Sequence, residues 1–155
     1  MSWFNYAGLV IVAIIMMPNI IYAIKKTDGF DNAYKNKTAI ICEQVGRYGC
    51  IAFMIFNIPY ASFNFWFNGA LIAYIAVNAA LCSAYIICWV VLWNKSGKVR
   101  ALFLSILPSC VFVFSGVMLV NIPLLVCSLI FAPSHILISC KNAKILSCNK
   151  KSEDF

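Results

Sequence analysis

Three ionisable side chains lie inside long apolar stretches of the chain. Glu43 and Arg47 are four residues apart, in the order that favours an ion pair on one face of a helix. His135 is the chain's single histidine, and histidine changes its charge near neutral pH. Charged groups are costly inside a membrane and usually face the interior of a helix bundle. The sequence therefore predicts a site where Arg47 meets an anionic group and where Glu43 and His135 carry a proton.

Further polar or amphipathic side chains are predicted at the same depth. Asn19, Glu43, Trp89 and His135 are each six residues from a flanking lysine, which corresponds to about 9 Å along a helix. Arg47 lies one turn deeper, and the face of Trp89 continues along its helix through two more polar side chains. The predicted cavity is lined by seven residues: Asn19, Glu43, Arg47, Asn78, Tyr85, Trp89 and His135.

The elements that position these residues follow from composition. Of 155 residues, 63% are apolar and 11% are charged, against about 25% charged in an ordinary globular domain. This balance excludes a soluble enzyme, a nucleic-acid binder and a disordered chain. Five apolar runs each meet the length of roughly 20 residues that a spanning helix needs. They are Trp3 to Ile24, Thr38 to Tyr60, Asn68 to Trp93, Ala101 to Val120 and Pro123 to Cys140. The predicted fold is an all-α bundle of five transmembrane helices.

The distribution of basic residues predicts the orientation of these helices. Eleven of the 12 lysines and arginines fall in the first link, the third link or the tail, and the positive-inside rule makes that side cytoplasmic. We therefore expect a multi-pass protein of the cell (inner) membrane, with the N-terminus outside and the C-terminus inside. Residues 1–140 would form a single transmembrane domain, and residues 141–155 a short basic cytoplasmic tail. Those eleven residues are Lys25, Lys26, Lys35, Lys37, Lys95, Lys98, Arg100, Lys141, Lys144, Lys150 and Lys151.

Two local patterns predict how the helices pack. Asn121-Ile122-Pro123 predicts a tight turn, so the fourth and fifth helices should form an antiparallel hairpin. Small residues recur along one side of the third run, at Gly69, Ala73, Ala76, Ala80 and Ala84. Such a row lets helix backbones approach closely, and we expect it to pack inside the bundle.

Three functional hypotheses are compatible with these patterns. The first, which we favour, is a transporter, a channel-type protein or a small-ligand-binding membrane protein. The second is an accessory or regulatory subunit of a larger membrane complex. The third is a membrane enzyme that acts on a lipid head group at the cytoplasmic face, with Glu43 and His135 as acid and base. We favour a role without catalysis and assign no catalytic residue.

The expected partners follow from the same composition. The basic rim should meet membrane lipids, and a complete carrier would need a second copy of the chain or a partner membrane protein. We expect no nucleic acid. The eight cysteines form no Cys-x-x-Cys motif and no zinc-ligand spacing, so we expect no metal and no cofactor.

The orientation is testable by cysteine labelling in a background from which the native cysteines have been removed. A membrane-impermeant thiol reagent added from outside should label a cysteine placed at position 64 but not one placed at position 97. The reason is the uneven distribution of basic residues between the two sides of the membrane. Labelling of position 97 alone would reverse the assignment.

Overall fold

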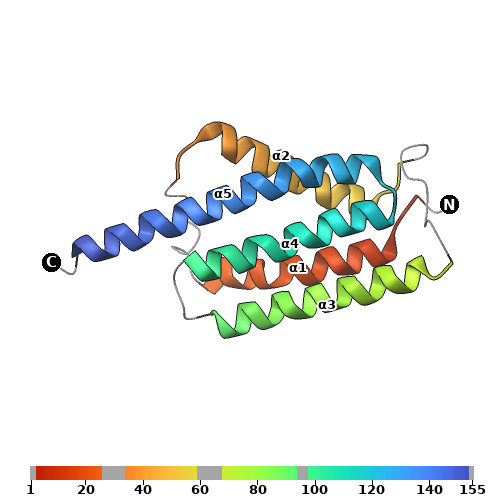
Figure 1. Ribbon diagram of the computed structural model, residues 1–155, viewed down its shortest axis with the longest axis horizontal. Helices are drawn as coiled ribbons and strands as arrows, with labels where there is room; N and C mark the ends of the chain where they lie inside the picture. Colours follow the sequence, from red (N-terminus) through yellow and green to blue (C-terminus); the bar gives the residue numbers. More distant parts are fainter. Residues whose placement is uncertain (1–2, 26–33, 59–67, 94–97, 154–155) are drawn as a thin grey trace.

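The chain folds into five α-helices connected in an antiparallel, up-and-down order (Figure 1). The computed structural model describes residues 3–25, 34–58, 68–93 and 98–153. Each predicted apolar run corresponds to one helix, so the all-helical prediction is confirmed. The helices are α1 Tyr6–Lys25, α2 Lys37–Ile55, α3 Ala70–Val91, α4 Lys98–Met118 and α5 Ile122–Glu153.

Four of these described helices are long and apolar enough to cross a membrane. The bundle also exposes large apolar side chains, among them Ile72 at 73% and Val90 at 70%, as expected of a surface that faces lipid. These findings indicate a multi-pass membrane protein. The helix outside this group is α2, which carries Lys37, Glu43 and Arg47. The four candidate spans are Tyr6–Lys25, Ala70–Val91, Val99–Met118 and Ile122–Ile145.

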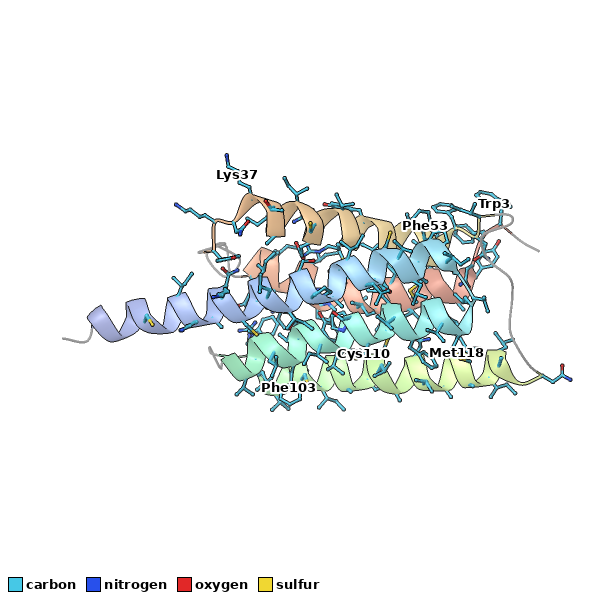
Figure 2. All side chains as sticks on the ribbon, turned by 45° about the horizontal axis from the view of Figure 1, so that its top comes forward. Trp3, Lys37, Phe53, Phe103, Cys110 and Met118 are labelled. Atoms are coloured by element: carbon cyan, nitrogen blue, oxygen red, sulfur yellow. The ribbon has the colours of Figure 1, made fainter. Side chains whose placement is uncertain are left out.

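The two ends of the bundle differ in what they contain. Trp3 lies at one end of the bundle and Lys37, the first residue of α2, lies at the other (Figure 2). The C-terminal part of α5 projects past the other helices (Figure 1), because α5 continues as helix for 32 residues, to Glu153. The predicted boundary between domain and tail at residue 140 is therefore not a helix end. The predicted labelling positions, 64 and 97, lie outside the described residues.

The helices α2 and α5 approach each other closely at two glycines of α2. A Cβ atom added at Gly46 would lie 2.9 Å from the backbone of Phe131, and one added at Gly49 would lie 2.5 Å from the Cys127 sulfur. Increasing residue numbers on α2 thus match decreasing numbers on α5, so the two helices are antiparallel. Glycine is required at Gly46 because no other residue would let the two backbones approach so closely.

The end of the bundle near Trp3 is held by backbone hydrogen bonds. The amide of Asn5 donates to the Ile55 carbonyl at 2.7 Å, and the amide of Asn57 donates to the Trp3 carbonyl at 2.9 Å. The Trp3 ring stacks on Phe56 with ring centroids 5.8 Å apart. The segment before α1 is therefore attached to the segment after α2.

The predicted hairpin between α4 and α5 is confirmed. Val120 has a positive φ of 47° in the turn, and Asn121 caps the start of α5 by accepting a hydrogen bond from the Leu124 amide at 3.1 Å. The Asn121 side chain also donates to the Phe53 carbonyl of α2 at 2.9 Å. One buried asparagine thus joins the hairpin to α2.

The predicted inward position of the small-residue row on α3 is wrong. Ala76 and Ala80 are exposed, whereas Tyr74, Asn78 and Tyr85 are buried on the opposite side of the helix. The physical reason is size and polarity: the interior takes the large aromatic and amide side chains that need packing and hydrogen-bond partners. Of the small-residue row, Gly69, Ala76 and Ala80 are exposed, and Ala73 and Ala84 are half-buried.

The α2–α5 contact generates a stability prediction. Gly46→Ala should lower the free energy of unfolding by about 1–3 kcal/mol, because the new methyl group meets the Phe131 backbone, which cannot rotate away. Gly49→Ala should have a smaller effect, because it mainly meets the Cys127 side chain. Unfolding in mixed detergent micelles measures both variants. Equal effects, or no effect at Gly46, would contradict the close approach.

Candidate functional site

A buried carboxylate lies between α2 and α5. Arg47 Nη2 and His135 Nδ1 both contact the same atom, Oε1 of Glu43, and the His135 contact is 3.1 Å long. The Glu43 side chain is 5% exposed, against 34% for Arg47 and 21% for His135. The i,i+4 ion pair and the inward position of His135 agree with the sequence prediction. One acidic side chain therefore joins a cation on its own helix to a titratable group on another.

Phe131 holds the imidazole of His135 in place. The two rings stack with centroids 4.7 Å apart and planes 18° apart. Phe131 in turn packs edge-on against Phe112 of α4, with centroids 5.7 Å apart. Phe131 and His135 are one turn apart on α5, so the residue that touches Gly46 also orients the histidine. This support was missed at the sequence level, although the i,i+4 spacing of the two rings was visible.

A second polar contact lies between α1 and α3. The Tyr85 hydroxyl donates to Asn19 Oδ1 at 3.2 Å, and the Asn19 amide donates to the Ile15 carbonyl at 3.2 Å. Trp89 packs edge-on against Tyr85, with ring centroids 6.4 Å apart. These contacts join α1 to α3.

Asn78 belongs to a different part of the bundle. It is fully buried, donates to the Tyr74 carbonyl at 2.9 Å and accepts from the Ser115 hydroxyl at 3.3 Å. It lies seven residues from Tyr85 on α3, about 10 Å along the helix. These contacts connect α3 to α4, and they do not bring Asn78 to the Glu43 carboxylate.

An aromatic and cationic cluster lies beyond Trp89, toward the end of α3. Arg100 lies over the ring of Tyr22 at 4.4 Å and over that of Trp89 at 5.1 Å, and it donates to the Tyr22 hydroxyl at 3.2 Å. Lys25 lies over Trp93 at 5.9 Å. Arg100 was predicted only as a member of the basic rim, and its packing on aromatic rings was not. A basic residue beside an aromatic helix end was the available signal.

The predicted depths of Asn19 on α1 and Trp89 on α3 differ from the structure by one helical turn. Asn19 and Trp89 were expected at one level, but Asn19 contacts Tyr85 and Trp89 contacts Tyr22. The reason is that α3 ends at Val91, four residues before Lys95, so the helical rise does not apply to that count. The counts for Glu43 and His135 run along unbroken helix, because α2 begins at Lys37 and α5 continues past Lys141. These two residues do meet.

Comparison with known proteins adds no relative: no family model, no curated protein and no solved structure matches the chain.

The Glu43–Arg47 pair generates a prediction about stability. Arg47→Met should lower the free energy of unfolding by about 1–3 kcal/mol, because it leaves the buried carboxylate without its neighbouring cation. Glu43→Gln combined with Arg47→Met should recover most of that loss, because a matched removal leaves no unpaired charge. Unfolding in mixed micelles measures both.

The control is Lys37→Met, which removes an exposed cation from the same helix and should change stability little. A double variant as unstable as Arg47→Met alone would show that the pair is not the source of the effect.

Proposed function

We propose that the chain is a small membrane protein that binds a small solute or ligand at the Glu43–Arg47–His135 cluster, as a transporter or a channel-type protein does. The observation that carries the proposal is the pair of contacts that Arg47 and His135 make to one buried carboxylate oxygen. Ionisable groups within a bundle of membrane helices commonly mark a substrate or ion pathway.

The partial exposure of Arg47 supports a role in binding a solute in addition to its structural role as the partner of Glu43. Its side chain is 34% exposed while the carboxylate that it contacts is 5% exposed. A guanidinium carries five N–H donors, and a single nitrogen, Nη2, makes the contact with Glu43. Arg47 therefore has donor capacity that an entering solute would use. In this proposal Tyr85 and Asn19, which hydrogen-bond to each other, would add neutral hydrogen-bonding groups.

In this proposal α2 is a fifth membrane-spanning helix. Its 19 residues correspond to about 28 Å, close to the roughly 30 Å of a bilayer's hydrocarbon core. The close contact with α5 at Gly46 and the neutralisation of Glu43 by Arg47 support its insertion. The N-terminus would then be outside and the C-terminus cytoplasmic, with the basic rim on the anionic lipids of that side.

A second candidate function is that of an accessory subunit. The observation that favours it is the exposed row of small residues on α3, which includes Ala76 and Ala80. Small residues on a lipid-facing surface are typical of helix–helix interfaces in membranes. A partner membrane protein or a second copy of the chain would pack there.

A binding screen tests the first proposal. Purified protein in detergent is heated with methanesulfonate, glycerol or choline, which represent an anionic, a neutral and a cationic solute, and its unfolding is followed by tryptophan fluorescence. One of them should raise the unfolding midpoint of the wild type, because a ligand that binds the folded state stabilises it. The Glu43→Gln, Arg47→Met double variant should not respond.

The matched control is Lys37→Gln, which removes a positive charge from the exposed start of α2 and should respond as the wild type does. A double variant that responds as strongly as the wild type would contradict binding at this cluster. A wild type that responds to none of the three solutes would contradict the binding of a dissolved solute at this cluster.

A further inference from the structure

Glu43 is shared between two groups that contact the same one of its oxygens. Arg47 Nη2 and His135 Nδ1 meet at a single oxygen, Oε1. In a neutral imidazole one nitrogen donates and the other accepts, so the contact with a carboxylate assigns the hydrogen to Nδ1. The nitrogen that remains to take up a proton is then Nε2.

The net charge of the cluster depends on that proton. With a neutral imidazole, Glu43 and Arg47 cancel and the cluster has no net charge. With a proton on Nε2 the cluster has one net positive charge, because Glu43 then faces two cations. A net positive charge in an apolar surrounding is unfavourable unless an anion compensates for it.

We propose that this site binds an oxyanion on Arg47 together with one proton on His135. The inference rests on the proposed function and names its substrate class: a carboxylate, a sulfonate or a phosphodiester, groups that a guanidinium can bind through two parallel hydrogen bonds. Protonated His135 holds Glu43, which frees the donors of Arg47 for the incoming anion. Because the coupling is reciprocal, bound anion favours protonated His135 and protonated His135 favours bound anion.

The other groups near His135 do not supply this compensation in the described residues. From α2, Glu43 and Arg47 face it. On α4, Arg100 lies on Tyr22 and Trp89, and Cys110 is exposed. On α5 itself the nearest lysine, Lys141, is exposed and six residues away, about 9 Å.

The experiment uses the fact that His135 is the chain's single histidine. Protein labelled with isotopes at histidine alone gives one imidazole signal, whose chemical shift follows its protonation between about pH 5 and pH 8. Methanesulfonate is the soluble probe because it stays ionised throughout that range. Saturating methanesulfonate should raise the titration midpoint by about one pH unit, which corresponds to roughly tenfold coupling.

Two variants separate this inference from a general salt effect. Arg47→Gln should abolish the shift of the midpoint while His135 still titrates. Lys37→Gln, which removes an exposed positive charge from the same helix, should keep the shift.

A lipid arm distinguishes a dissolved anion from a lipid head group. In nanodiscs of phosphatidylcholine with added phosphatidylglycerol, a shift without methanesulfonate identifies the phosphodiester of an anionic lipid as the occupant. A shift that requires methanesulfonate identifies a dissolved anion. Either result supports the inference.

The inference is overturned if neither probe moves the midpoint, or if Arg47→Gln leaves the shift intact. In that case the solute screen still reports on the proposed function by itself. Stabilisation of the wild type by glycerol or choline, without a change in the His135 midpoint, would retain a binding site and reject its coupling to a proton and an anion.

Discussion

The packing of α2 against α5 is the constraint on which the polar cluster depends. Gly46 brings the α2 backbone onto Phe131, and in an antiparallel pair one turn along from this contact leads to Glu43 on α2 and His135 on α5. The contact of 3.1 Å between those side chains thus lies one helical turn along the same antiparallel helix pair. A larger residue at Gly46 would separate the helices, and the buried carboxylate would lose its partner on α5.

The positions of α2 and α4 in the bundle depend on their contacts with α5. The Asn121 side chain caps α5 and binds the Phe53 carbonyl of α2, so the α4–α5 hairpin and the end of α2 are fixed together. Phe112 of α4 packs on Phe131, and Phe131 in turn stacks on the His135 ring. The helices α1 and α3 join through the hydrogen bond between Tyr85 and Asn19.

Periodicity and composition were sufficient to predict the five helices, the hairpin and the meeting of Glu43, Arg47 and His135. These features depend on local rules: apolar length, i,i+4 spacing and the need to pair a charge away from water. Two features of α3 could not be predicted: the outward position of Ala76 and Ala80, and the separate location of Asn78. Both depend on which large side chains are buried between the helices. That competition is decided by contacts between helices that are distant in sequence, and a single sequence does not contain them.

The exclusion of α2 from the four apolar spans has the same physical origin as the site. Glu43 and Arg47 lower the hydropathy of α2, and the two glycines that admit α5, Gly46 and Gly49, add no apolar side chain to it. Hydropathy counts each residue as if it faced lipid alone, whereas Glu43 faces Arg47 and His135. The two charged residues that form the ion pair therefore account for the absence of α2 from the apolar spans.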